Sequence, residues 1–152
     1  MIKKINLFFC VILLSTLIVG CGSNSLTGKY HCVNAFVTDD VFEHENRTET
    51  IESLDVDLDS LPEIKITGSG ENIKLEVSNG DDSHMEQIVI GDEDNDSILF
   101  YLSETSPSQL AFLYFKDSGE LNMLIPVSFN FDAVGVYEGF EGQTVMCMTY
   151  KK

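Results

Sequence analysis

Apolar and polar side chains alternate along two long stretches of this 152-residue chain. In residues 72–78 one face carries Ile73, Leu75 and Val77, and the stretch ends at Asn79-Gly80, a strong hairpin signal. In residues 121–131 the face expected to point inward consists of Leu121, Met123, Ile125, Val127, Phe129 and Phe131. A period of two places alternate side chains on opposite faces of a β-strand. Because no stretch beyond residue 20 has helical periodicity, we expect an all-β domain.

Seven shorter segments are also expected to be strands: residues 29–37, 51–58, 63–67, 85–90, 98–103, 109–115 and 144–150. Turn-forming residues separate them, among them Pro62, Gly91, Pro107 and the tripeptide Asp117-Ser118-Gly119. Pro126 interrupts a ladder position, which favours a strand edge or a bulge there. Residues 39–50 are the least regular and are expected to form a loop or one helical turn. About eight to ten short strands joined by tight turns indicate an antiparallel barrel or a sandwich.

The first twenty residues differ from the rest of the chain. Two lysines precede an apolar run over residues 5–19, which is the layout of a secretory signal peptide and is shorter than a spanning helix requires. The run ends at Ile18-Val19-Gly20-Cys21, which resembles the lipobox of bacterial lipoproteins. The resemblance implies cleavage before Cys21, diacylglycerol on its thiol, and palmitate among the acyl chains of that residue. A plain signal peptide followed by an incidental cysteine is the alternative.

This resemblance predicts three parts: a signal peptide at residues 1–20, a lipidated tether at residues 21–25 and one β-domain at residues 26–152. Several acyl chains on Cys21 would hold the protein stably at a membrane of the cell envelope, outside the cytoplasm. Gly22 stands where Asp would imply retention in the inner membrane, so in a Gram-negative host the outer membrane is favoured.

The formal net charge is −16, and loss of the two lysines of the leader would make it more negative by two. Nucleic acid is therefore excluded as a partner, because binding to phosphates requires a clustered basic face. Such a charge serves solubility, and it also suits a cationic partner such as a basic protein or a metal ion.

Two cysteines, Cys32 and Cys147, remain after Cys10 is lost with the leader and Cys21 is lipidated. An even pair in an exported domain indicates a disulfide. It would close a loop of over about 100 residues and contribute about 4 to 5 kcal/mol in the chain-entropy model. The first and last strands would then be neighbours, which favours a closed up-and-down barrel over a sandwich.

Two short motifs add resemblances to known families. The segment Leu26-Thr27-Gly28-Lys29-Tyr30 resembles the Gly-x-Trp opening of lipocalin-like (calycin) barrels, with Tyr30 where that family has Trp. The chain contains no Trp, so this resemblance implies the fold and no ligand. Tyr30-His31-Cys32 is similar to the Tyr-x-Cys near the start of membrane-bound lysozyme inhibitors of the C-type family, which are also small barrel lipoproteins.

The sequence contains two candidate metal sites. Residues 92–96 carry Asp at alternate positions as a calcium loop does, but Ser97 and Ser103 stand where that loop needs Gly and Glu. An acidic hairpin turn is therefore favoured, with weak calcium binding as the alternative. A copper(I) site would combine His31 and Cys32 with Met146-Cys147-Met148. A disulfide, with both methionines lining the core, is the preferred interpretation.

No catalytic residue, metal ligand or cofactor site is predicted. His31, His44 and His84 share no metal-binding spacing, and the chain has no Gly-x-Ser-x-Gly or Ser-x-x-Lys motif. Asp55, Asp57 and Asp59 are expected on one strand face. Because like charges on one face repel each other, we expect this face to be the solvated outer one. We therefore expect a protein that is not an enzyme.

Three functions remain open from the sequence. The first is a binding module of the cell envelope that holds an apolar small ligand inside the barrel, because inward apolar side chains occur on nearly every strand. The second is an acidic module that binds a cationic hydrolase such as lysozyme. The third is an envelope protein without a small ligand.

Overall fold

The computed structural model describes residues 25–42 and 50–152. Nine strands lie in these ranges: β1 (Gly28–Thr38), β2 (Thr50–Ser53), β3 (Glu63–Thr67), β4 (Lys74–Asn79), β5 (Asp82–Glu93), β6 (Ser97–Leu102), β7 (Ala111–Phe115), β8 (Leu121–Pro126) and β9 (Val145–Lys151). Three short helical segments accompany them: η1 (Leu58–Ser60), η2 (Gly70–Asn72) and α2 (Val136–Phe140). The predicted leader and tether, with Cys21, lie outside the described residues except for Ser25.

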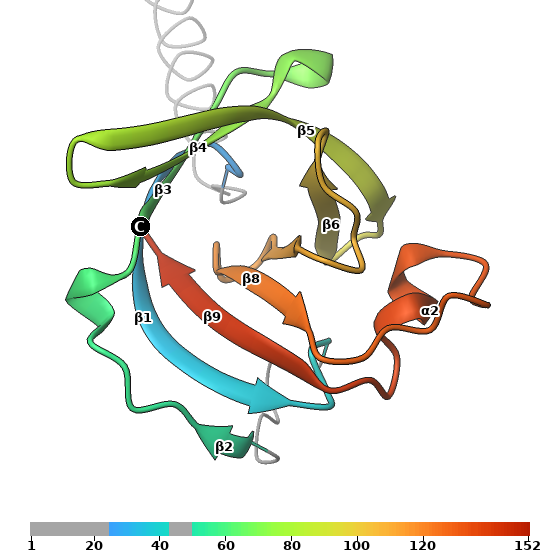
Figure 1. Ribbon diagram of the computed structural model, residues 1–152. Coiled ribbons are helices and arrows are strands. Elements are labelled where there is room, and N and C mark those ends of the chain that lie inside the picture. Colours follow the sequence, from blue (N-terminus) through green and yellow to red (C-terminus); the bar gives the residue numbers. More distant parts are fainter. Residues whose placement is uncertain (1–24, 43–49) are drawn as a thin grey trace, which may run out of the picture.

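The strands form a closed antiparallel barrel, as predicted (Figure 1). From β3 to β9 each strand pairs with the next along the chain. β1 completes the barrel because its first residues pair with β3 and residues 31–38 pair with β9. β2 pairs only with the end of β1, so it is a ninth strand outside the ring of eight. The expectation that the first and last strands are neighbours is therefore confirmed.

Turn chemistry explains the hairpins that the sequence predicted. β4 and β5 are joined by a two-residue turn in which Gly80 has φ +61°, and Asn79 pairs with Asp82 across it. Gly119, with φ +70°, lies in the turn between β7 and β8. Glycine adopts such left-handed angles without steric cost, which is why both turns fall where the sequence placed them.

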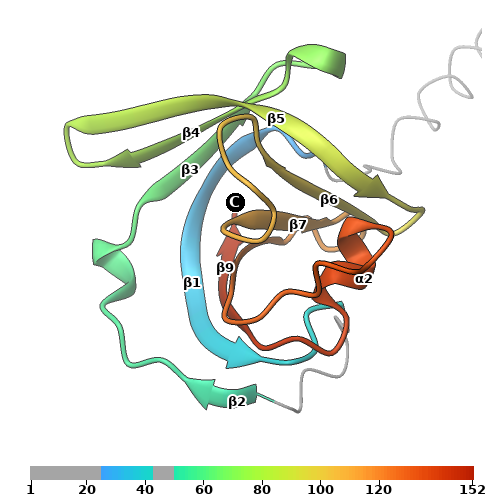
Figure 2. The same cartoon turned by 45° about the vertical axis from the view of Figure 1, so that its right-hand side comes forward.

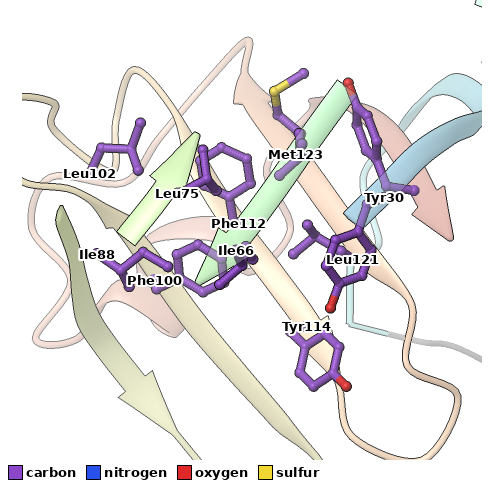
Figure 3. Close-up of a cluster of buried hydrophobic side chains, with 12 residues drawn as sticks. Tyr30, Ile66, Leu75, Ile88, Phe100, Leu102, Phe112, Tyr114, Leu121 and Met123 are labelled. Atoms are coloured by element: carbon purple, nitrogen blue, oxygen red, sulfur yellow. The ribbon is translucent and has the colours of Figure 1, made fainter. Parts of the chain in front are cut away.

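The barrel interior is a packed apolar core (Figure 3). All eight strands of the ring contribute, and nine of the twelve buried side chains are at most 1% exposed. The twelve are Tyr30, Ile64, Ile66, Leu75, Ile88, Phe100, Leu102, Phe112, Tyr114, Leu121, Met123 and Tyr150. Ile73 and Val77 pack against this cluster, so the inward face predicted for residues 72–78 is confirmed.

A second apolar cluster lies on the opposite face of β6 to β9. Side chains that alternate with the interior ones, such as Leu99, Leu113 and Leu124, belong to it. The short helix α2 and nearby residues cover this face through Phe140 and Val41. All five residues of β7 are consequently buried, and its sequence is an uninterrupted apolar run.

Two strand predictions were too long. β8 ends at Pro126, which has no N–H to continue the ladder, and the chain then leaves for α2. Val127 and Phe131 are 67% and 79% exposed, so their predicted inward position is wrong. The strand predicted at residues 51–58 ends at Ser53, and η1 follows. Within residues 39–50, positions 43–49 lie outside the described residues.

Candidate functional site

The chain from the end of β2 to η1 is exposed and acidic, and its residues 52–59 are called here the acidic strap. Four carboxylates in it are exposed: Glu52, Asp55, Asp57 and Asp59. Three aliphatic side chains alternate with them: Leu54, Val56 and Leu58. Val56 is the most exposed of the three, at 42%, whereas Leu54 and Leu58 are half-buried. The strap therefore combines four exposed carboxylates with one exposed and two half-buried aliphatic side chains.

Local hydrogen bonds fix the shape of the acidic strap. The backbone N–H of Leu54 donates to the carbonyl of Ala35 at 3.0 Å, which ties the start of the strap to β1. The Asp57 carboxylate caps η1 by accepting from the N–H of Asp59, at 3.2 Å. Because Asp57 has this capping role, the alternating acids that suggested a strand face are in fact spread around an extended segment and one helical turn.

A hollow of about 160 Å³ separates η1 from β1. The hollow lies beside the part of β1 that pairs with neither β3 nor β2. In Figures 1 and 2, η1 lies on the side of β1 that faces away from β9. The lining is mixed polar and apolar: His31, Cys32, Leu58, Asp59, Leu61, Pro62 and Glu63.

Glu63 forms one wall of the hollow and is already paired. Its carboxylate lies 2.6 Å from the ammonium of Lys29 and 3.0 Å from Nδ1 of His31. The hydrogen bond from Lys29 is the main cause that lowers the pKa of Glu63 below its ordinary value. Within the described residues, no lysine or histidine pairs with the four carboxylates of the strap, so their charge is not neutralised in this way.

Most lysines of the described residues are paired elsewhere. The four pairs are Lys29–Glu63, Lys65–Glu76, Lys116–Glu93 and Lys151–Glu120, with N–O distances between 2.6 and 3.7 Å. Exposed pairs of this kind contribute little stability, but they neutralise the few basic groups that the chain has. The remaining surface field is dominated by acidic groups.

The predicted disulfide is absent, and Cys32 and Cys147 both carry thiols. An extra residue, Val33, makes a β-bulge in β1, so that Cys32 lies on the interior face whereas Cys147 belongs to the cluster on the other face. Cys32 is opposite Tyr150, three positions along β9 from Cys147, which is roughly 10 Å. A disulfide tolerates a Cα separation of at most about 7 Å.

Neither thiol is set up as a nucleophile or as part of the copper site considered from the sequence. Burial raises the pKa of Cys32, whose Sγ donates to the carbonyl of Asn34 at 3.4 Å. The Cys147 Sγ donates to Oδ1 of Asn122 at 3.6 Å. Because the two sulfur atoms face opposite sides of the sheet, they do not converge on one ion. Of the two methionines expected to line the core, Met148 packs against the interior cluster, whereas Met146 is half-buried and belongs to neither apolar cluster.

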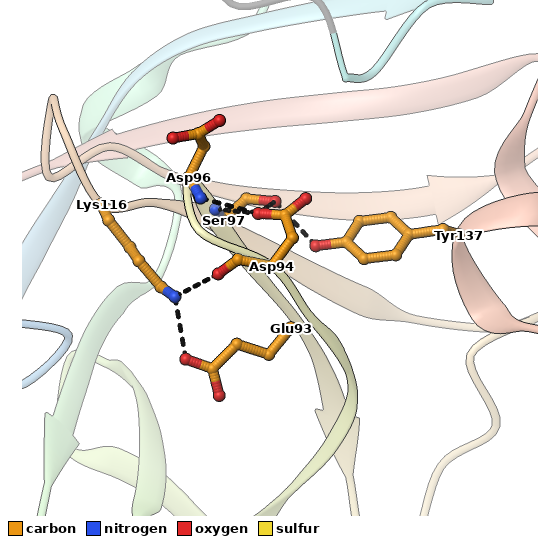
Figure 4. A network of polar contacts seen from close by, with 6 residues as sticks. All are labelled: Glu93, Asp94, Asp96, Ser97, Lys116 and Tyr137. Carbon is orange, nitrogen blue, oxygen red and sulfur yellow. Dashed lines mark hydrogen bonds and ion pairs between the residues drawn. The ribbon is translucent and has the colours of Figure 1, made fainter.

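The acidic segment between β5 and β6 is a hairpin turn, as favoured from the sequence (Figure 4). One oxygen of Asp94 accepts hydrogen bonds from the backbone N–H groups of residues 96 and 97, at 2.8 and 2.6 Å. The Lys116 ammonium contacts Glu93 at 2.8 Å and the Asp94 carbonyl at 2.5 Å. Backbone N–H groups thus occupy carboxylate oxygens of Asp92 and Asp94, and a lysine lies beside the turn.

Sequence reasoning missed one group of polar side chains. His84, Glu86 and Glu104 offer donor atoms that all lie within 4.8 Å of one another. His84 and Glu86 share a strand face, which their spacing of two could have shown, but Glu104 reaches them only through the pairing of β5 with β6. His44 and Cys21 lie outside the described residues.

Comparison with known protein families, curated proteins and solved structures found no match to this chain. In the described part of the chain, no helix has the length and apolar character needed to cross a membrane.

Proposed function

We propose that this protein is a lipoprotein anchored through Cys21, and that its barrel is a binding module for a cationic protein at the acidic strap. The observation that carries the second part is the strap itself, where exposed carboxylates without a lysine or histidine partner among the described residues alternate with the exposed Val56 and the half-buried Leu54 and Leu58 beside a hollow. Complementary charge steers association and sets its specificity, while apolar contacts supply affinity.

The filled interior supports a surface site over an apolar ligand inside the barrel. An internal ligand would have to displace side chains such as Phe100 and Phe112, whose rings stack with centroids 5.1 Å apart and which are fully buried. Eight-stranded barrels are commonly just wide enough for their own side chains. Uptake of a hydrophobic dye, displaced by fatty acids, would support the internal ligand instead.

The lipid anchor is supported by the sequence of residues 1–21 and limits where the partner can be. If Cys21 carries acyl chains, the six residues between it and Gly28 reach at most roughly 25 Å from the membrane surface. Metabolic labelling with palmitate should mark the wild-type protein and not Cys21→Ala, which should leave the membrane fraction. A Cys21→Ala protein that remains with the membrane would contradict the anchor.

Binding at the acidic strap can be tested with a basic hydrolase such as lysozyme as the probe. The triple variant Asp55→Asn, Asp57→Asn, Asp59→Asn removes three charges, and Asn at position 57 can still cap η1. We expect the wild-type protein to associate with the hydrolase at low salt, and we expect added salt to weaken this association. The affinity of the triple variant should be about tenfold lower.

A matched control removes three exposed charges elsewhere, at Glu71, Asp81 and Asp82. It should bind the probe nearly as well as the wild type. Equal weakening in both triple variants would mean that only net charge matters and would contradict a site on the strap. Absence of association with any of a panel of basic hydrolases at low salt would remove the proposed partner class.

A further inference from the structure

Two polar side chains of β5 lie on the face that points into the barrel. His84 is opposite Val77 and Glu86 is opposite Leu75 in the pairing with β4. Directly opposite residues of an antiparallel pair project to the same side, and Leu75 belongs to the interior core. The His84 side chain is 67% exposed and that of Glu86 is 10% exposed. The two side chains therefore form a row that runs from one open end of the barrel toward its core. We call this end of the barrel the mouth.

Glu104 joins this row from the turn after β6. The N–H of Ser103 donates to the carbonyl of Gln87 at 2.9 Å, which holds the turn against β5. The N–H of Glu104 donates to Oε2 of Glu86 at 3.3 Å. The other oxygen of Glu86 lies 2.5 Å from Nε2 of His84. Two strands and a turn thus bring one imidazole and two carboxylates together.

The charge at the mouth is unusual for this protein. Four other carboxylates, such as Glu76 and Glu93, have a lysine partner, whereas no lysine of the described ranges pairs with Glu86 or Glu104. Two carboxylates held close together repel each other unless a proton or a cation lies between them. Because the Glu86 side chain is only 10% exposed, this repulsion is less screened than between two carboxylates at the surface.

The donor set indicates which cation fits. One imidazole nitrogen with two carboxylate oxygens matches Zn²⁺ and related transition metals, whereas Ca²⁺ and Mg²⁺ prefer oxygen ligands alone. A hollow of about 220 Å³ lined by Val77, Asn79, Asp82, Ser83 and His84 adjoins the group on its solvent side. A fourth ligand, such as water, can approach from there.

We propose that His84, Glu86 and Glu104 bind a Zn²⁺-class divalent ion at the mouth of the barrel, with solvent as the fourth ligand. Tetrahedral coordination brings donor atoms to roughly 3.5 Å from one another. Nε2 of His84 and the Glu86 oxygen, now 2.5 Å apart, must therefore separate to admit the ion, and the wider spacings of up to 4.8 Å must contract. The exposed side chains of His84 and Glu104 can make this movement, while Glu86 is held by the strand and the turn. The site does not depend on the proposed function, which uses other residues.

Calorimetric titration of the full chain with Zn²⁺, after treatment with a chelator, tests the proposal. The variants His84→Ala and Glu104→Gln change mostly exposed side chains, so they should fold, and each should weaken binding by about tenfold or more. The matched control is His31→Ala, because His31 forms a similar pair with Glu63 at 3.0 Å but Lys29 already neutralises that carboxylate. The control should bind Zn²⁺ as the wild type does.

Three results would overturn the proposal: Zn²⁺ affinity that is unchanged in both mouth variants, affinity that falls equally in His31→Ala, or preference for Ca²⁺ over Zn²⁺. A Zn²⁺-dependent change in the ring resonances of His84, and not of His31, would confirm the imidazole as a ligand. Far-ultraviolet circular dichroism of each variant shows that a loss of binding is not a loss of fold.

Discussion

Tyr150 and Tyr30 offer a test of the interior core, because both rings are fully buried but only one hydroxyl is satisfied. The Tyr30 hydroxyl donates to the carbonyl of Leu26 at 2.6 Å. The Tyr150 hydroxyl is buried and has no hydrogen-bond partner among the described residues. A buried hydroxyl without a partner costs about 1 to 3 kcal/mol, and a satisfied one contributes about 1 kcal/mol. The isosteric change to Phe should therefore have opposite signs at the two positions.

We expect Tyr150→Phe to raise the free energy of unfolding by about 1 kcal/mol and Tyr30→Phe to lower it by about 1 kcal/mol. Urea unfolding followed by circular dichroism measures both, and an unchanged dependence on urea concentration shows that the change is in stability alone. If Tyr150→Phe destabilises the protein as much as Tyr30→Phe does, the Tyr150 hydroxyl is satisfied and the reasoning is refuted.

The same tyrosines predict sensitivity to alkaline pH. Burial is the main cause that raises the pKa of Tyr30 and Tyr150 well above the ordinary value of 10.0. Above that value the unfolded chain loses these protons while the folded protein keeps them, so stability should fall as pH rises. Each tyrosine contributes a loss of about 1 kcal/mol per pH unit. Tyr150→Phe should therefore make the free energy of unfolding fall less steeply with pH, by the contribution of one tyrosine. Urea unfolding between about pH 9 and 11 measures this dependence.

Three further predictions concern the cover of the outer face and the cysteines. Asp92→Ala should cost about 1 kcal/mol in urea unfolding, because the Asp92 carboxylate accepts hydrogen bonds from the first N–H groups of α2 at 2.9 and 3.0 Å. Gly139→Ala should cost about 1 to 3 kcal/mol in the same assay, because a Cβ there would overlap the ring of Phe129. In the folded protein a thiol reagent should label Cys32 slowly and Cys147 only after unfolding, whereas a disulfide in mass spectra of the unreduced protein would contradict free thiols.

Patterns within one strand were the part of the fold that the sequence could predict. The strand predicted at residues 63–67 coincides with β3, and the turn at Asn79-Gly80 joins β4 and β5. In these segments one face is buried, so period-two alternation directly reports the structure. β7 shows where this information ends, because α2 and its neighbours cover its outer face and all five of its residues are apolar. The sequence does not state which elements cover which face.

The candidate sites were harder to predict because each depends on register. The extra residue Val33 shifts the register, so that β1 residues on either side of it exchange faces. Period-two alternation in the sequence does not reveal this bulge, and for that reason it could not show that Cys32 and Cys147 point apart. Glu104 is 18 residues from Glu86 and meets it only because β6 returns along β5. The acidic strap was visible as alternating Asp residues, but the cap that Asp57 makes on η1 turned a predicted strand into an irregular segment.

Pairing of β1 with β9 has a consequence for how the chain acquires its structure. β1, the first of the described strands to be synthesised, must wait for the seven residues of β9 before its hydrogen-bonding groups on that side are satisfied. Until then β1 and β8 each expose a row of free N–H and C=O groups that another chain could use. A protein shortened before Val145 would keep both rows exposed permanently, so it should self-associate instead of forming a smaller stable domain. Contacts of such long sequence separation also favour slow folding.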